Sequence, residues 1–239
     1  MAGRKRPWIL ITVAAVAVLA ALAAIFGPQI YAQSQGPAPE PLTVATPSGT
    51  ASTAPSSTAT SGAVSDSTDE GAWNVASGSQ AGYRIDEVLN GADVTVVGRT
   101  EKVTGSATVS GAQLTAAKID VDVASIATDS GNRDNYFRGT AMKADTFPTA
   151  TFTLTSPVTI PALSSAPAAV EAKGTLELAG QKRDVTAMLQ VVRDGAKVSV
   201  SGTIGLVLAD FGITPPDLGF VKVDNTGSVE FLVHLEKAA

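Results

Sequence analysis

Residues 170–178, VEAKGTLEL, alternate strictly between small or apolar side chains and polar ones. Successive side chains of a β-strand point to opposite faces of the sheet, so a period of two is typical of a strand. One face, with Ala172 and Gly174, is expected to meet an apolar interior. The other face, with Glu171 and Lys173, is expected to meet water.

The same alternation recurs on both sides of this stretch. Small or apolar residues occupy every second position of 185–191 and 198–206, and Asp194-Gly195 between them predicts a tight hairpin because glycine supplies positive φ. The remaining strands are predicted around Tyr83 and Ile85; Val94 to Val97; Ala107 and Val109; Ile119, Val121 and Val123; Ala150, Phe152 and Leu154; and Val229, Phe231, Val233 and Leu235. The pattern indicates about eight antiparallel strands.

Strands with one apolar face each must stack as two sheets or close into a barrel. Closure removes exposed strand edges, and an eight-stranded barrel is just wide enough to be filled by side chains or to hold one slender ligand. The inward positions Ala172, Gly174, Ala187 and Gly202 carry small residues. Composition leaves two interpretations of them: they make room inside the barrel, or they relieve crowding where strands bend.

A helix-like insert interrupts the strands at residues 128–152, TDSGNRDNYFRGTAMKADTFPTATF. The side chain of Ser130 or Asp129 can cap a short helix over 132–142, because its oxygen accepts hydrogen bonds from free N–H groups of the first turn. The Phe-Pro step at 147–148 forces an extended backbone, and so marks the exit into the next strand.

Two arginines of the insert, Arg133 and Arg138, lie near its start, where the dipole of the predicted helix is positive. Guanidinium groups at this place could hold a phosphate or pyrophosphate headgroup. The alternative interpretation is a structural ion pair of Arg133 with Asp134 or with Asp210.

Large apolar residues of the insert are predicted to plug the barrel mouth or to form its wall: Phe137, Met142, Phe147 and Phe152. A second segment, residues 210–216, is predicted to end a strand in a turn. It leaves three residues available to close one end of the barrel: Phe211, Ile213 and Phe220. This segment is interpreted as a flexible rim, or alternatively as a fixed loop whose aromatic residues cover the core.

The N-terminal region differs in composition from the rest. Residues 1–32 hold a basic cluster at 4–6 and then an apolar run over 8–26 that only Thr12 interrupts. Such a run makes a helix of roughly 28 Å, close to the roughly 30 Å thickness of the bilayer core. It predicts a single-pass membrane anchor with a cytoplasmic N-terminus and an extracytoplasmic domain. The alternative is a cleaved secretory signal, which exports the domain as well.

Residues 33–70 are rich in Pro, Ser, Thr, Ala and Gly and carry few charges. Such a segment has too little apolar surface to offset the entropy of ordering it, so a disordered linker is predicted. The folded part is then residues 71–239, which is long enough for one domain.

Composition and motifs argue against several function classes. A net charge of −5 without a basic stripe disfavours nucleic acid, and the absence of cysteine excludes disulfides, thiolate metal sites and thiol catalysis. The one histidine, His234, is predicted to face solvent together with Glu230 and Glu236. No nucleophile elbow, phosphate-binding glycine motif or calcium-loop spacing is found. Because these motifs are absent, we expect no enzyme, cofactor or metal. A hydrolase on the same scaffold would need a polar cleft.

The insert, together with GTLELAG at 174–180, DFGI at 210–213 and VEF at 229–231, resembles the YceI-like family of polyisoprenoid- and lipid-binding domains. The resemblance runs from about Trp73 to Glu236. It implies an all-β, closed antiparallel eight-stranded lipocalin-like barrel with a short helical insert, hollow and enclosing an apolar tunnel.

The resemblance also implies a function: sequestering or carrying a long-chain isoprenoid, such as an isoprenoid quinone or polyprenyl lipid. The residues expected to line the barrel and its mouth are Phe137, Met142, Phe147, Phe152, Leu154, Gly174, Leu176, Gly202, Ile204, Phe211, Ile213 and Phe220, with Arg133 and Arg138 as possible headgroup contacts. The alternative function is a cell-surface adhesion or cell-wall interaction module, which predicts a filled barrel.

Overall fold

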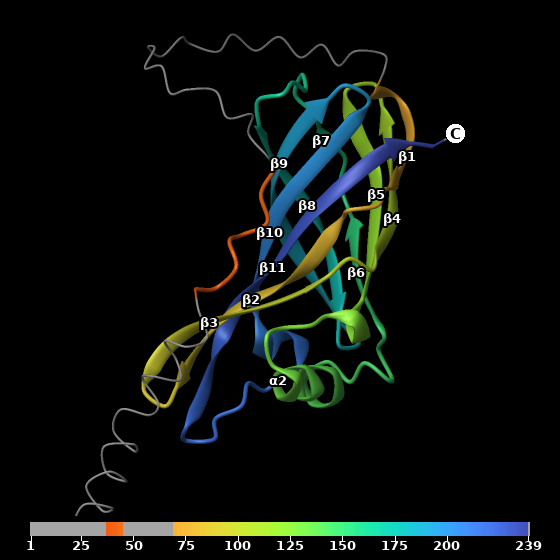
Figure 1. Cartoon of the computed structure of the whole chain (residues 1–239). Coiled ribbons are helices and arrows are strands. Elements are labelled where there is room, and N and C mark those ends of the chain that lie inside the picture. The colour runs from red at the N-terminus through yellow and green to blue at the C-terminus, as the bar shows by residue number, and fades with distance from the viewer. Residues whose placement is uncertain (1–36, 45–68, 239) are drawn as a thin grey trace, which may run out of the picture.

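The computed structural model describes residues 37–44 and 69–238 (Figure 1). Its strands are β1 (Gly71–Val75), β2 (Gln80–Leu89), β3 (Ala92–Thr100), β4 (Val103–Ser110), β5 (Gln113–Asp122), β6 (Thr149–Leu154), β7 (Val158–Thr159), β8 (Ala168–Leu178), β9 (Gln181–Asp194), β10 (Lys197–Val207) and β11 (Val221–Lys237). The helical segments are the 3₁₀ turns Val123–Ser125 and Leu208–Phe211, the α-helix α2 (Gly131–Tyr136) and the π-helical turn Phe137–Ala141.

Eight strands close into an antiparallel barrel in the order β1-β4-β5-β6-β8-β9-β10-β11, and β11 pairs with β1 to complete the ring. The prediction of a closed eight-stranded barrel with one short helix is confirmed. The alternation in β8 is also as predicted: Ala172, Gly174 and Leu176 are buried, whereas Glu171 and Lys173 are exposed. The hairpin at Asp194-Gly195 joins β9 to β10, with φ of 59° at Gly195.

The make-up of the ring differs from the prediction at two places. The predicted strands around Tyr83 and Val96 are β2 and β3, and both lie outside the ring. The strand β1, which the pattern did not indicate, is part of the ring. The reason is the length of β11, which has 17 residues. Its residues 221–232 pair with β2 and its last three residues pair with β1.

The strands β2 and β3 with the start of β11 form a three-stranded ribbon, which we call the flap. Between Val223 and Gly227 the register of β11 against β2 shifts, and such a bulge bends a strand. The ribbon projects beyond the barrel at the end where α2 lies (Figure 1). Its middle strand β2 and its edge strand β3 are joined by Asn90-Gly91, both with positive φ, which is the turn that a right-twisted hairpin prefers.

The helical insert covers 131–141, close to the predicted 132–142, but it is not one α-helix. In place of one helix over 132–142, α2 ends at Tyr136 and a π-helical turn follows. The side chain of Ser130 at the N-cap makes no capping hydrogen bond, so the predicted cap is wrong. The buried carboxylate of Asp134 instead accepts hydrogen bonds from the N–H and the hydroxyl of Thr128, at 2.9 and 2.7 Å. These bonds fix the chain that enters α2.

The segment 37–44, PAPEPLTV, lies against the outside of the barrel, and we call it the strap (Figure 1, orange). Its Val44 is buried, and the N–H of Val44 donates to the hydroxyl of Ser201 at 3.0 Å. The prediction of disorder for 33–70 is therefore wrong for these eight residues. It is also wrong at Asp69, which is buried and forms an ion pair with Arg193.

The predicted membrane anchor, residues 1–32, falls outside the described residues and stays a prediction. Within 37–44 and 69–238, no helix has the length and apolar character that crossing a bilayer requires.

Candidate ligand-binding cavity

A cavity of about 560 Å³ runs along the inside of the barrel. Its volume is within the range of about 300–1,000 Å³ that is usual for ligand sites. One end lies at Trp73 and Leu163, and the other lies between α2 and the loop before β11. Strands β2 and β3 widen the wall at this second end, because they add residues such as Leu89 and Val96 to the eight-stranded ring. An empty apolar space of this kind contradicts the filled barrel that an adhesion module predicts.

The cavity wall is almost entirely apolar. Among the described residues that line it, only Asp69, Arg84, Glu87 and Arg133 are charged. Each of the four has an ion-pair partner: Arg193, Glu230, Arg133 and Glu87, respectively. The wall therefore presents hydrocarbon to whatever fills it.

The cavity reaches the surface beside α2. Leu218 and Tyr136 both line the cavity and are exposed, at 62% and 37% of their full areas. Lining residues at the opposite end, such as Trp73, Val191 and Val198, are buried. We call the opening between α2 and the loop 214–218 the mouth.

One arginine stands at the mouth, and acidic groups surround it. Nη2 of Arg133 donates to Oε1 of Glu87 at 2.9 Å, and Nη1 donates to Oδ1 of Asp129 at 2.6 Å. Burial alone would lower the pKa of Arg133, but the hydrogen bond and charge of Glu87, with the charge of Asp129, outweigh burial and raise it. The guanidinium thus stays charged and is committed to two carboxylates.

A tyrosine connects the flap to the helical insert beside this arginine. The ring of Tyr83 on β2 stacks on Phe137, with centroids 4.8 Å apart and planes 15° apart. Gly98 on β3 makes this possible, because an added Cβ would approach the Tyr83 ring to 2.5 Å. Burial raises the pKa of the Tyr83 phenol, so the group remains neutral at physiological pH.

The structural ion pair expected of Arg133 exists, but with other partners than predicted. Asp134 binds Thr128, and the partners of Arg133 are Glu87 and Asp129. Sequence spacing could not show this, because Glu87 lies 46 residues away on β2. Arg138 does not line the cavity, and its Nη2 donates to the side-chain oxygen of Asn135 at 2.9 Å.

The predicted lining residues divide into two groups. Seven of the twelve line the cavity: Phe137, Met142, Phe152, Leu154, Leu176, Ile204 and Ile213. The other five lie elsewhere: Phe147, Gly174, Gly202, Phe211 and Phe220. Which of these residues contact a ligand remains a prediction.

The two glycines face inward but do not leave the space that we expected of them. A Cβ at Gly174 would meet the ring of Phe152 at 2.4 Å, and one at Gly202 would meet the ring of Phe231 at 2.7 Å. Each glycine leaves room for an aromatic ring from a neighbouring strand, which packs directly over its Cα atom. The rings, and not the glycines, form the cavity wall here.

Three phenylalanines lie away from the cavity for different reasons. Phe147 packs over the turn between β8 and β9, where a Cβ on Gly180 would meet its ring at 2.5 Å. Phe211 is buried in the core, in the 3₁₀ turn that Gly212 ends with φ of 67°. Phe220 is 56% exposed at the tip of the flap, so it does not close the barrel.

His234 and Glu230 lie on the outer face of β11, but neither simply faces water. His234 Nδ1 lies 2.9 Å from the hydroxyl of Ser199, outside the cavity. Glu230 is only 1% exposed, which contradicts its predicted solvent position. Its carboxylate receives Arg84 Nε at 3.2 Å and Arg99 Nη2 at 2.6 Å. In the described part of the chain, no group of three or more acidic or histidine side chains could hold a metal ion.

Sequence reasoning missed the contribution of β2 to the site. Glu87, Leu89 and Tyr83 all line the cavity from this strand. The alternation in 80–89 predicted a strand but not its position in the fold. The Asn90-Gly91 turn was a usable signal that β2 and β3 form their own hairpin.

Together, these features define a closed antiparallel β-barrel with an apolar internal cavity large enough for a ligand. The sequence model of the YceI-like domain matches residues 73–235, and the chain belongs to the YceI-like family. The resemblance seen in the sequence is thereby confirmed. No curated protein matches the chain significantly.

Solved structures with the same fold include a polyisoprenoid-binding domain from Saccharophagus degradans, implicated in plant cell wall breakdown. It is 17% identical, with 70% of this chain and 98% of that chain covered and a TM-score of 0.56. BcnA of Burkholderia cenocepacia is 21% identical, with 65% and 95% covered and a TM-score of 0.53. The YCEI protein of Campylobacter jejuni is 17% identical, with 59% and 85% covered and a TM-score of 0.50. At these identities the likeness concerns the fold.

Proposed function

We propose that this protein is a membrane-tethered extracytoplasmic carrier that holds a long-chain isoprenoid, or a related amphiphilic lipid, in its barrel. The observation that carries the proposal is the cavity of about 560 Å³, with apolar walls along its length and polar groups only at its ends. The polyisoprenoid-binding domain with the same fold supports the choice of ligand class. The predicted anchor at residues 1–32 supports the location.

Partition into the cavity supplies the affinity without a covalent step. At about 25 cal/mol per Å² of apolar area, hiding a few hundred Å² of tail contributes several kcal/mol. The cavity wall offers no unpaired charge that the tail would desolvate, since each charged lining residue has a partner. The tail therefore meets no opposing polar cost.

The mouth favours an uncharged headgroup. Arg133 is the cation that lines the mouth, and Glu87 and Asp129 together outweigh its charge. A phosphate would have to displace these carboxylates and approach them closely, which costs energy at a partly buried site. A quinone or an alcohol needs only hydrogen bonds, which Ser130, Asn132 and the Tyr83 phenol can supply at the cavity wall. We therefore favour an isoprenoid quinone or polyprenol over a polyprenyl phosphate.

Native mass spectrometry of the full chain, purified from its own membranes, tests the proposal directly. We expect a co-purified lipid of isoprenoid mass. Preparations that are lipid-free and that bind neither quinone nor polyprenol would overturn the carrier function.

A matched pair of variants locates the ligand. Leu189 lines the cavity near its middle, whereas its neighbour Met188 is 57% exposed on the outer face. Leu189→Trp should fill the cavity and abolish lipid uptake, while Met188→Trp should take up lipid normally. Circular dichroism checks that both variants keep their β-structure, and equal uptake by both would place the ligand outside the barrel.

A further inference from the structure

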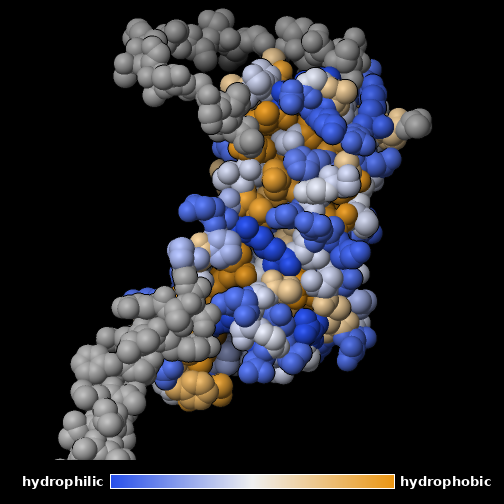
Figure 2. All heavy atoms as spheres, in the orientation of Figure 1, coloured by the Kyte–Doolittle hydropathy of each residue, from blue (hydrophilic) through white to orange (hydrophobic). Residues whose placement is uncertain are grey.

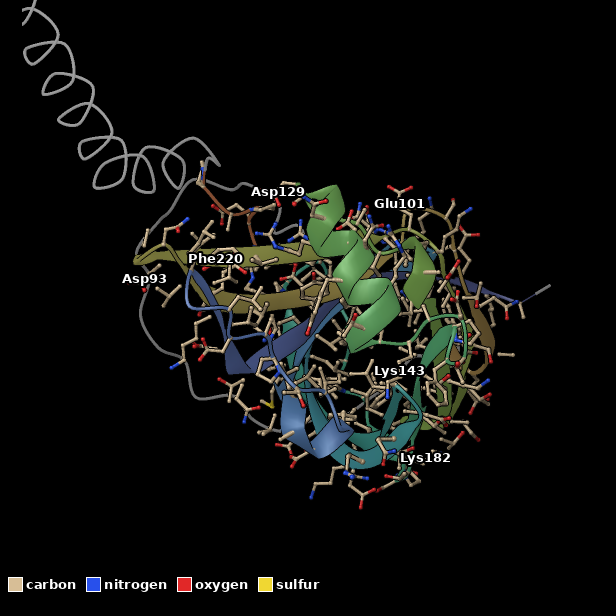
Figure 3. All side chains as sticks on the ribbon, turned by 90° about the horizontal axis from the view of Figure 1, so that it is seen from below. Asp93, Glu101, Asp129, Lys143, Lys182 and Phe220 are labelled. Carbon is tan, nitrogen blue, oxygen red and sulfur yellow. The ribbon has the colours of Figure 1, made fainter. Side chains whose placement is uncertain are left out.

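The tip of the flap carries apolar side chains in water. Phe220 and Leu218 are 56% and 62% exposed, and Val88 on the adjoining strand is 37% exposed. Lys222 pairs with Val88, and the N–H of Asn90 donates to the carbonyl of Phe220 at 2.6 Å, so the three side chains belong to one tip. Figure 3 shows Phe220 beside Asp93 at the edge of this end of the molecule. Figure 2 shows apolar side chains at the lowest part of the flap.

The backbone holds these side chains out in a fixed way. Gly219 has φ of 79° and lies between Leu218 and Phe220 in a turn that the N–H of Leu218 closes by donating to Val221, at 2.8 Å. A side chain of Asp217 accepts the N–H of Gly219 at 3.3 Å. A formed turn presents its apolar residues without the entropy cost of ordering a loose loop.

The tip is also the rim of the cavity. Leu218 lines the mouth, and Leu89 and Val221, which pair with each other at the tip, line the cavity on the inner face of the flap. Val88 and Phe220 do not line it. Apolar surface thus continues from the inside of the barrel over the edge of the flap to its outer face.

We propose that the tip of the flap docks into the outer surface of a phospholipid bilayer, so that a lipid passes between bilayer and cavity without crossing water. This inference rests on the proposed carrier function. Exposed Phe and Leu side chains gain free energy when they leave water for an apolar phase. The continuous apolar rim gives the tail of the ligand a path to the mouth.

The position of the strap supports this occupant. The carbonyl of Pro39 accepts a hydrogen bond from Arg84 Nη2 at 2.6 Å, and Arg84 lies on the flap strand β2. The ten residues 27–36 separate the strap from the apolar run 8–26. Fully extended, they span at most about 35 Å. A bilayer that holds the apolar run is therefore within reach of the flap.

A second copy of the chain is the weaker occupant. Three side chains at a narrow tip offer a few hundred Å² at most, whereas stable protein interfaces bury about 1,200–2,000 Å². The charges of the flap tip do not favour anionic lipid either, since Asp86, Asp93 and Asp217 outnumber Lys222. The contact must rest on apolar insertion, so zwitterionic lipid should suffice.

Depth measurements on the full chain test the contact. The chain has no cysteine, so Phe220→Cys carries a single nitroxide label. In phosphatidylcholine vesicles we expect the label to collide with oxygen and to be shielded from a water-soluble nickel chelate. Ala196→Cys, in the exposed hairpin at the opposite end of the barrel, should show the reverse. Equal access of the chelate to both labels would overturn the proposal.

Flotation separates this inference from the proposed function. A chain that floats with the vesicles but leaves the label at residue 220 in water keeps its tether and loses the docking. A chain that does not float refutes the tether and the docking together. Binding of quinone from detergent micelles is measured independently, and its absence refutes the carrier function alone.

Uptake rates give a second readout. Val88→Ser/Phe220→Ser changes neither cavity lining nor mouth, and Val207→Ser/Met188→Ser is a control with matched exposures of 40% and 57%. We expect the flap variant to take up a quinone from vesicles about tenfold more slowly. A factor of about ten corresponds to roughly half of the free energy that one such side chain gains when it is fully buried. Uptake from micelles should be unchanged. An unchanged rate from vesicles, or an equal loss from micelles, would overturn the docking.

Discussion

Glu230 shows how a single buried charge organises the outside of this barrel. Its carboxylate is 1% exposed and binds two arginines, Arg84 and Arg99, which are about a quarter exposed. The spare donors of the arginines bind the carbonyls of Pro39 and Glu40 in the strap. A buried carboxylate needs such partners, because leaving one charge of a buried pair unpaired is costly.

Replacing this carboxylate should destabilise the fold strongly. Glu230→Gln leaves two arginines partly buried without a counter-charge, and we expect a loss of about 2–4 kcal/mol in the free energy of unfolding. Urea denaturation of the variant measures this loss. Glu236→Gln, on the same strand at an exposed position, should change stability by less than about 0.5 kcal/mol. Similar effects of both would show that the ion pairs contribute little.

The glycines of β10 give a second test at this level. A Cβ at Gly202 would lie 2.6 Å from the carbonyl oxygen of Met188 and 2.7 Å from the Phe231 ring, whereas one at Gly205 meets nothing within 4 Å. We expect Gly202→Ala to lower the free energy of unfolding by about 2–3 kcal/mol, because the backbone cannot move aside. Gly205→Ala should be neutral or slightly stabilising. Thermal unfolding distinguishes them, and equal midpoints would contradict the packing described.

These residues also mark the limit of sequence reasoning. Alternation correctly placed Gly202 on the inner face, because a period of two depends only on the strand. It could not show that Phe231, a cross-strand neighbour, fills the space above the glycine. In the same way, Glu230 was placed on the outer face, but the arginines that bury it come from strands far away in sequence.

Among the elements, the strap departs most from its prediction. Composition indicates disorder for residues 37–44, since proline and small residues supply little apolar surface. The strap nevertheless binds through backbone groups: two carbonyls accept from arginines, and the N–H of Val44 donates to Ser201. Backbone contacts leave no trace in composition. The long strands, by contrast, were predictable because each carries its own alternation, whereas the five-residue β1 was missed.

One substitution in the strap tests whether it stays docked. Val44 is 6% exposed, whereas its neighbour Thr43 is exposed. A charge at position 44 cannot remain buried unpaired, so Val44→Asp should release the strap. We expect hydrogen exchange of residues 37–44 to become about tenfold faster or more, because protection follows the free energy of local opening. Thr43→Asp should exchange like the unchanged protein, and equal rates in both variants would refute the docking of the strap.

Considered as a whole, the molecule is a barrel whose closed end is built from the eight-stranded ring and whose open end is widened by the flap. The resemblance to the YceI-like family anticipated the ring, the insert and seven residues of the cavity wall. It did not anticipate that the arginine at the mouth is neutralised by Glu87. This ion pair is the reason why we propose a neutral headgroup, such as that of a quinone or polyprenol, and not the phosphate that Arg133 and Arg138 were considered able to hold.

The choice of headgroup leads to a prediction for the whole chain. A ligand that binds only the folded state stabilises it by about 2.7 kcal/mol at a hundredfold excess over Kd, and this raises Tm by about 5–10 °C for a domain of this size. We expect this rise with an isoprenoid quinone, and little or none with a polyprenyl diphosphate of the same tail length. Leu189→Trp should abolish the rise, while Met188→Trp should keep it. A larger rise with the diphosphate would mean that Arg133 leaves Glu87 to bind the anion, and the neutral-headgroup assignment would be wrong.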